Sequence, residues 1–104
     1  MKDQNIFEIF KMRDTAVKTK KKDLFLSTQI NNVDIGRSLW SGYLELSDLV
    51  SRVLYIHHEE KSENLWIVFV KEEYYKNKKF THAAYLLYYV TKIGSESKIS
   101  AIVG

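Results

Sequence analysis

The segment Leu65–Val70 constrains the fold most strongly, because it places six apolar residues in a row. Asn64 and Lys71 bound the run, and its length is typical of a strand and short for a buried helix. A run that is apolar on both sides of the pleat predicts a strand that is covered on both faces. We therefore expect Leu65–Val70 to lie at the centre of a sheet.

The chain has 104 residues, which leaves room for one hydrophobic core, so residues 1–104 are expected to form a single domain. Hydrophobic residues make up 45% and charged residues 28%, as in ordinary folded domains. Cysteine is absent, which excludes disulfides, a thiolate zinc site and a cysteine nucleophile. No apolar run approaches the roughly 20 residues that span a bilayer, and Met1–Asn5 lacks the features of a signal peptide. We expect a cytoplasmic chain without a membrane partner.

The first third of the chain predicts a helix and then a strand. Apolar residues at helical spacing predict a helix from Asp3 to about Val17. The charged tract Lys18–Lys22 is then expected to connect this helix to the next element. Apolar and β-favouring residues predict a strand over residues 23–30, which ends in turn residues at Asn31–Asn32.

The remainder of the chain predicts two more helices and a closing strand. The spacing of apolar residues predicts a helix from Ser47 to His57, while the competing interpretation is a strand over Val53–Ile56 that pairs through a turn with Leu65–Val70. A helix is also predicted over His82–Ile93, followed by a strand over Lys98–Val103. Together these elements predict an α+β domain, with a small, mostly antiparallel sheet of three or more strands packed with two or three helices.

Charge is distributed in three blocks. Residues 1–22 carry a net charge of +4, residues 23–73 a net charge of −5, and residues 74–104 again +4. If the fold brings the two ends together, their lysines form one positive patch that suits a polyanion; otherwise they serve solubility. Thirteen of the 16 basic residues are lysine, which favours attraction to a phosphate backbone over readout of bases. The patch would consist of Lys18, Lys20, Lys21, Lys22, Lys76, Lys78 and Lys79.

Tyrosines adjoin the second group of lysines. On a helix, Tyr85, Tyr88, Tyr89 and Lys92 share one face, where the rings would stack on unpaired bases together with the preceding Tyr74 and Tyr75. The alternative is that the tyrosines are buried in the core. If the segment is instead a strand, Tyr85 and Tyr89 share one face while Tyr88 points away.

A second aromatic segment predicts a protein contact. Arg37, Trp40 and Tyr43 lie close together in the sequence, and these residue types are common anchors of interfaces. In so small a protein, however, a tryptophan is more often part of the core.

Catalytic and metal-binding motifs are weak. The cluster from His57 to Glu60 has no second histidine pair at ligand spacing, and the four glycines form no phosphate-binding loop, so we expect no metal and no cofactor. The best enzyme alternative is a small basic ribonuclease that uses His57 or His82.

The leading interpretation is a non-catalytic module that binds single-stranded DNA or RNA with little preference for sequence. The alternative is an accessory subunit or inhibitor that docks on a larger protein. The high use of Lys, Asn, Ile and Tyr resembles that of an AT-rich coding sequence, and small chains of this kind are often encoded by phages or mobile elements. In that setting the larger protein would belong to replication or defence machinery. The residues expected to bind nucleic acid are Lys18, Lys20, Lys21, Lys22, Tyr74, Tyr75, Lys76, Lys78, Lys79, Tyr85, Tyr88, Tyr89 and Lys92.

Overall fold

A computed structural model describes residues 3–30 and 40–103. Within these ranges, the helices α1 (Asp3–Thr19) and α2 (Lys22–Ser27) precede the strands β1 to β4. The strands are β1 (Asp48–His58), β2 (Leu65–Lys76), β3 (Lys79–Ile93) and β4 (Glu96–Val103). Residues 40–43 are also helical. The expected α+β class, with an antiparallel sheet and helices, is confirmed.

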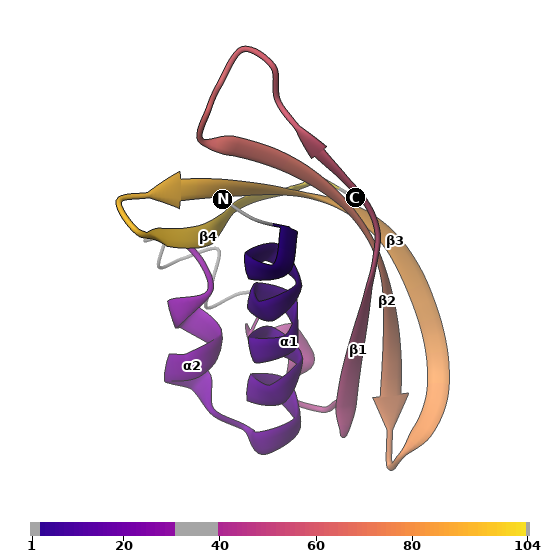
Figure 1. Ribbon diagram of the computed structural model, residues 1–104. Helices are drawn as coiled ribbons and strands as arrows, with labels where there is room; N and C mark the ends of the chain where they lie inside the picture. Colours follow the sequence, from indigo (N-terminus) through magenta and orange to yellow (C-terminus); the bar gives the residue numbers. More distant parts are fainter. Residues whose placement is uncertain (1–2, 31–39, 104) are drawn as a thin grey trace.

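The sheet is an antiparallel meander in the order β1-β2-β3-β4. It curves around α1, and α2 lies beside α1 on the same side (Figure 1). Irregular pairing interrupts each of the three ladders, and such bulges increase the local bend of a sheet. The concave face therefore encloses α1, and we call it the inner face.

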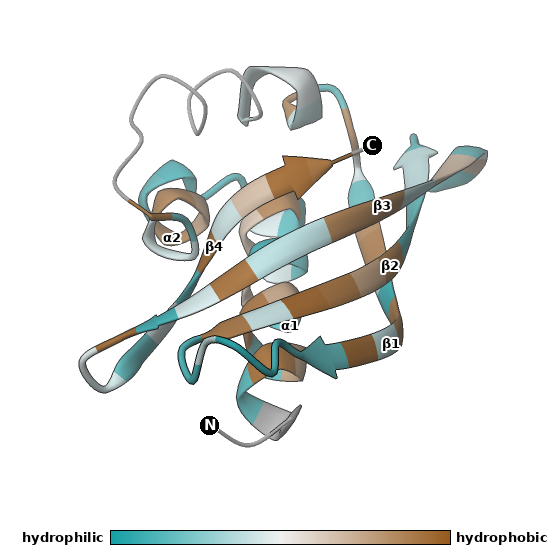
Figure 2. Ribbon diagram, turned by 90° about the horizontal axis from the view of Figure 1, so that it is seen from above, coloured by the Kyte–Doolittle hydropathy of each residue, from teal (hydrophilic) through white to brown (hydrophobic). Residues whose placement is uncertain are grey.

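The core lies between α1 and the inner face. Along α1 the buried apolar positions recur at helical spacing, and along β2 they alternate with more exposed ones. Figure 2 views the sheet with α1 behind it and shows apolar residues recurring along the strands. One cluster combines Ile6, Ile9 and Phe10 with Trp66, Val68, Val70, Tyr88, Val90 and Ile99, and the other contains Ala16, Val17, Phe25, Trp40, Leu46 and Leu49.

Three sequence predictions hold in this structure. The helix expected from Asp3 to Val17 is α1, the strand expected at Leu65–Val70 begins β2, and the closing strand is β4. However, the described helices cover β2 on its inner face only. Phe69 on the outer face retains 37% of its exposure, and both helices lie on the inner side (Figure 1).

The strand expected over residues 23–30 is wrong, because Lys22–Ser27 forms the short helix α2. The helix turns Phe25 fully into the second core cluster, with Leu24 and Leu26 packed at its edge. Only the end of the predicted strand pairs, through an isolated parallel bridge between Gln29 and Ile99. The turn expected at Asn31–Asn32 lies outside the described residues.

The helix expected over Ser47–His57 is wrong, and the competing strand is correct and longer, as β1. A bulge between Val53 and Tyr55 shifts the alternation of the strand. Leu49, Val53 and Ile56 therefore all pack toward the core at a spacing that imitates a helix.

The helix expected over His82–Ile93 is also wrong, because the segment is the central strand β3, paired on both sides. Its outer face carries Tyr85 and Leu87, so both faces are apolar and the pattern has no clear period. Gly94 does adopt a positive φ of 63°, but it does so in the turn between β3 and β4.

We predict that Tyr88→Ala costs about 3–5 kcal/mol of stability, because the ring is completely buried and packs edge-on against Phe10 at 5.0 Å. The hydroxyl of Tyr88 has no hydrogen-bond partner among the described residues. Tyr88→Phe should therefore change the stability by less than about 1 kcal/mol. Urea unfolding measures both variants, and an alanine variant as stable as the parent would contradict this packing.

Candidate nucleic-acid interface

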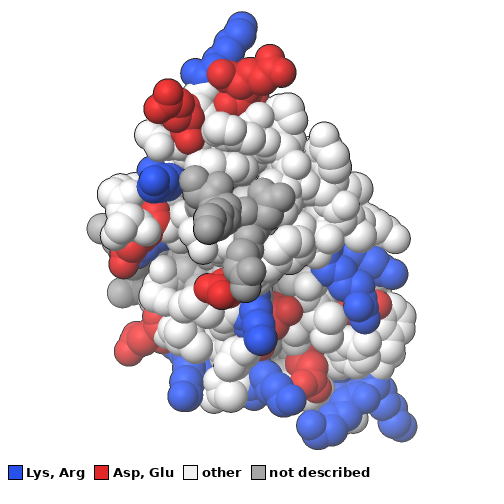
Figure 3. Space-filling view, in the orientation of Figure 1, with Lys and Arg blue, Asp and Glu red and all other residues white. Residues whose placement is uncertain are grey.

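The seven lysines of the predicted patch gather at one end of the molecule, which we call the lysine end. Lys18, Lys20, Lys21 and Lys22 lie where α1 joins α2, while Lys76, Lys78 and Lys79 lie at the turn between β2 and β3. Figure 3 shows lysine and arginine side chains along this lower edge of the molecule.

Residues 44–48 connect the two groups of lysines. The ammonium of Lys20 donates to the carbonyl of Leu44 at 2.9 Å and also to that of Leu46. Ser47 binds the other group, because its amide donates to the carbonyl of Tyr75 at 2.9 Å and its hydroxyl accepts from the amide of Lys78 at 2.9 Å. The two basic ends of the sequence are therefore held together by one short segment.

Backbone conformation at both lysine groups produces tight reversals. Lys20 has a φ of 58°, and the amide of Lys21 returns to the carbonyl of Ala16, which closes the end of α1. Asn77 and Lys78 both have positive φ, as in the two-residue turns of hairpins. These turns project the lysine side chains outward, and all seven residues are exposed.

Carboxylates neutralise only part of the lysine end. Lys76 pairs with Glu45 at 3.0 Å, and this contact lowers the pKa of Glu45. Lys18 approaches Asp48 at 4.0 Å. Among the described residues, no carboxylate pairs with the other five ammonium groups. That of Lys20 binds backbone carbonyls, and those of Lys21, Lys22, Lys78 and Lys79 belong to exposed side chains.

The predicted tyrosines divide between the two faces of the sheet. Tyr75 and Tyr85 lie on the outer face, where Tyr75 packs against Phe80 and the 58%-exposed Tyr85 stacks on Phe69. Tyr89 is half-buried on the same face. The predicted stripe is wrong because alternation along a strand separates its members.

Three other predicted residues are not available at this surface. Tyr88 is sealed in the core, and Lys92 is half-buried at the opposite end of β3 from Lys79. Of the two interpretations of Trp40, interface anchor or core residue, the core is correct, because Trp40 is buried against Phe25 with ring centroids 5.3 Å apart. Arg37 lies outside the described residues.

A buried ion pair, which sequence reasoning missed, lies behind the lysine end. Arg13 of α1 donates from Nη1 to Oε2 of Glu72 at 3.0 Å, and both side chains are fully buried. The guanidinium also donates to the hydroxyl of Tyr43 at 2.8 Å. The hydroxyls of Tyr43 and Tyr74 donate to Oε1 of Glu72 at 2.9 and 2.8 Å. Phe25, Tyr43 and Tyr88 place their rings within 5.5 Å of the guanidinium carbon.

This network raises the pKa of its arginine and of its two tyrosines. Burial alone would lower the pKa of Arg13, but Tyr43 and Glu72 outweigh it and raise the pKa. Burial and the nearby negative charge of Glu72 raise the pKa of Tyr74, and burial also raises that of Tyr43. The arginine therefore stays charged and both tyrosines stay protonated at neutral pH, so the network persists over the physiological range.

The sequence does contain a signal for the pair. Arg13 falls between Phe10 and Val17 on the apolar stripe of α1, and Glu72 continues the inward alternation of β2 after Val70. Opposite charges on two buried stripes indicate a buried pair, because an isolated buried charge is too costly.

Other polar clusters are poor candidates for chemistry. His58 stacks on Trp66 at 4.6 Å, and His57 pairs with Ile67, while His82 lies beside Tyr74 at the far end of β2. Within the described ranges, no three acidic or histidine side chains are placed to hold a metal ion. The two histidines considered for ribonuclease activity therefore do not meet.

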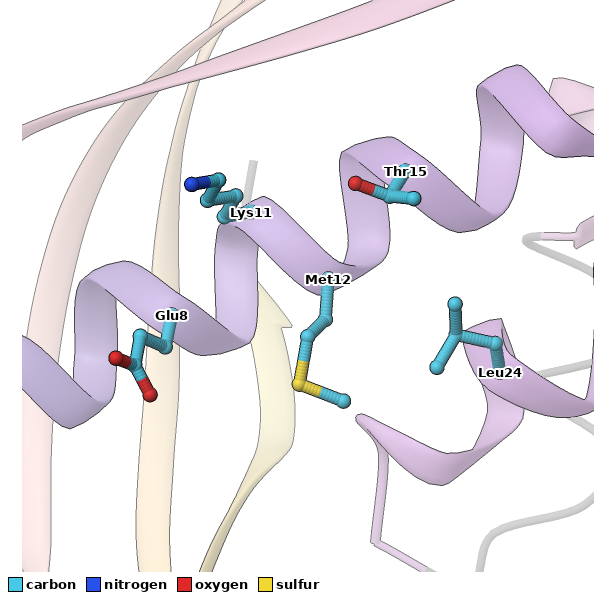
Figure 4. Close-up of a pocket in the computed structure, with 5 residues that line it drawn as sticks. All are labelled: Glu8, Lys11, Met12, Thr15 and Leu24. Carbon is cyan, nitrogen blue, oxygen red and sulfur yellow. The ribbon is translucent and has the colours of Figure 1, made fainter.

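A shallow hollow of about 300 Å³ lies where α1 meets α2 (Figure 4). Met12 points toward Leu24 of α2, and Glu8, Lys11 and Thr15 complete the wall. Its carboxylate and amine offset each other, so it has no net charge with which to attract an anion.

Comparisons with known proteins support the fold alone. No protein-family model matches the sequence, and no curated protein matches it significantly. An NTF-2 like protein of unknown function from Shewanella oneidensis has a similar structure, with a TM-score of 0.82 and 14% identity over 98% of this chain and 97% of its own. A protein of unknown function from Nostoc punctiforme, with a cystatin-like fold, gives a TM-score of 0.77 and 9% identity over 93% and 84%. The architecture is thus of the NTF2-like and cystatin-like type.

The described helices are too short or too polar to cross a membrane.

We predict that Glu72→Gln costs about 3–5 kcal/mol of stability, because it leaves the buried guanidinium of Arg13 uncompensated. Glu73→Gln is the matched control, since Glu73 pairs with the exposed Arg52 on the outer face, and it should cost at most about 1 kcal/mol. Urea unfolding compares the two. Equal losses would contradict a special role for the buried pair.

We predict a pH effect at Asp14, which accepts hydrogen bonds from the amide and hydroxyl of Ser51 at 2.7 and 2.6 Å. Burial raises the pKa of Asp14 to about 6, against the lowering effect of these hydrogen bonds. The folded state therefore binds a proton that the unfolded chain has released, and the contribution of Asp14 to stability falls as the pH rises from 4 to 7.

Asp14→Asn should remove this slope, which amounts to at most about 3 kcal/mol. The measurement is the free energy of unfolding of both proteins at several pH values. Parallel curves over this range would contradict the assignment.

Proposed function

We propose that this protein is a non-catalytic, cytoplasmic module that binds single-stranded DNA or RNA with little sequence preference. The observation that carries the proposal is the meeting of two lysine groups, from opposite ends of the sequence, at the lysine end. Five of these lysines have no carboxylate partner among the described residues, and four of the five, all except Lys20, are not held by backbone carbonyls either, so phosphates can replace their counterions.

Rings on the outer face support stacking of bases beside this surface. Tyr75 and Phe80 lie next to the turn between β2 and β3, with ring centroids 5.8 Å apart. At a rise of ~3.3 Å per residue along β3, Tyr85 lies about 20 Å from this turn. Stacking on such rings tolerates any base, and lysine rather than arginine dominates the cationic groups. Both features favour binding that is independent of sequence.

A second candidate function is docking on a larger protein, as an accessory subunit or inhibitor. A row of apolar side chains crosses the outer face in direct register, formed by Tyr55, Phe69, Leu87 and Val103, with exposures of 37–64%. Exposed apolar patches of this kind favour protein contacts. Leu87→Ser should then abolish binding of that protein while the affinity for oligonucleotides stays unchanged.

We predict that the affinity for a labelled single-stranded oligonucleotide falls steeply with salt. Contacts to about four to seven phosphates give a slope of roughly −3 to −5 in log affinity against log salt concentration. Lys22→Gln/Lys79→Gln, which removes one charge from each lysine group, should lower this slope by about 1.4. A fluorescence titration between low and physiological ionic strength measures it.

The matched control is Lys11→Gln/Lys61→Gln, which removes the same charge from exposed positions in α1 and in the turn before β2. It should leave the slope near that of the parent. Tyr85→Leu should weaken binding by about 1–3 kcal/mol without changing the slope. An affinity that does not depend on salt, or equal effects of the two double variants, would overturn the proposal.

A further inference from the structure

A pocket of about 420 Å³ opens on the inner side of the same hairpin. Its volume lies in the range of small-molecule sites, about 300–1,000 Å³. Residues 42–46 form one wall and the inner faces of β2 and β3 form the other. The lining residues are Gly42, Tyr43, Glu45, Leu46, Tyr74, Lys76, His82 and Ala84.

The aromatic wall of the pocket is held in place from behind. The rings of Tyr43 and Tyr74 stack with centroids 6.3 Å apart, and their hydroxyls are fixed on the buried Glu72. The imidazole of His82 lies 4.7 Å from the ring of Tyr74. Its Nδ1 is 3.0 Å from the hydroxyl of Thr81, which leaves Nε2 for a ligand. Three aromatic groups therefore present a preorganised surface to a flat molecule.

Charge at the rim of the pocket is suited to a phosphate. The ammonium of Lys76 is half-exposed and is held at 3.0 Å from Glu45, whose side chain is 80% exposed. An exposed pair of this kind contributes little to stability, so an anionic ligand displaces Glu45 at small cost. Lys76 also belongs to the lysine end, which places the pocket beside the path proposed for the nucleic-acid backbone.

We propose that this pocket binds a single nucleotide, with the base packed on His82 and Tyr74 and the phosphate at Lys76. The nucleotide is either the phosphorylated end of a bound strand or a free mononucleotide. Only the first of these two sources rests on the proposed function. Along β2, Tyr75 faces outward while Tyr74 and Lys76 face the pocket, so a strand that crosses the hairpin reaches both surfaces.

The test titrates adenosine 5′-monophosphate and adenosine into the isotope-labelled protein and follows the NMR signals of Tyr74, His82 and Lys76. We expect the monophosphate to shift these signals and to bind at least tenfold more tightly than adenosine. His82→Ala should weaken this binding at least tenfold. Phe7→Ala, which removes an exposed ring of α1 that does not line the pocket, should leave it unchanged.

A second variant tests the pocket in case His82→Ala unfolds the hairpin locally. A side chain added at Gly42 would meet no atom within 4 Å of its Cβ, so Gly42→Leu keeps the fold while it narrows the pocket. It should reduce binding of the monophosphate as His82→Ala does. If both variants bind the monophosphate as the parent does, or if the parent does not bind it, the pocket proposal is overturned.

The affinities of a 5′-phosphorylated and an unphosphorylated oligonucleotide distinguish the two sources of the nucleotide. Tighter binding of the phosphorylated strand, lost in His82→Ala, identifies a strand end, whereas monophosphate binding without this difference identifies a free nucleotide. The proposed function fails independently of the pocket. Lys21→Gln/Lys22→Gln, at the connection between α1 and α2 and outside the lining of the pocket, should weaken binding of the oligonucleotide and leave binding of the monophosphate unaffected. Monophosphate binding without any oligonucleotide binding would overturn the function but retain the pocket.

Discussion

The buried pair of Arg13 and Glu72 is the interaction on which the arrangement of helix and sheet depends. It joins α1 to β2 between the two clusters of the core, where neither charge has access to water. A guanidinium is tolerated there because a carboxylate, a hydroxyl and three aromatic rings surround it. Such a pair adds little net stability compared with apolar residues, but it specifies which face of α1 meets which strand.

The geometry of the lysine end follows from that placement. Because α1 is fixed against the inner face, its last turn lies beside residues 44–48, and Lys20 binds carbonyls of that segment. Ser47 in turn binds the β2–β3 hairpin. The same network fixes the tyrosines that line the pocket, through Glu72. One buried contact thus positions both the surface proposed for phosphates and the pocket proposed for a nucleotide.

The sequence predicts the fold class and the elements whose pattern is local. The single apolar stripe of α1 and the six-residue run of β2 have one interpretation each. β1 and β3 do not, because the bulge at Val53 to Tyr55 imitates a helical spacing and β3 is apolar on both faces. Their conformation is decided by pairing with distant segments of the chain. The spacing of apolar residues within one segment carries no information about that pairing.

The candidate site, too, could be predicted from the sequence only in part. The convergence of Lys22 and Lys79 was predicted as a condition, namely that the fold brings the ends together, and the structure fulfils this condition. Exposure of individual rings could not be predicted, because the side of the sheet occupied by Tyr85 or Tyr88 depends on register. The turn at Asn77 and Lys78 lacks the glycine that usually marks a hairpin, and so it gave no signal.

The most direct test of the account is lysine footprinting, in which amines are acetylated with and without a saturating single-stranded oligonucleotide and the sites are quantified by mass spectrometry. If the two basic ends form one phosphate-binding surface, protection appears together at Lys20 to Lys22 and at Lys78 and Lys79, while Lys11 and Lys61 react as before. Protection of only one group, or uniform reaction of all the amines, would contradict it.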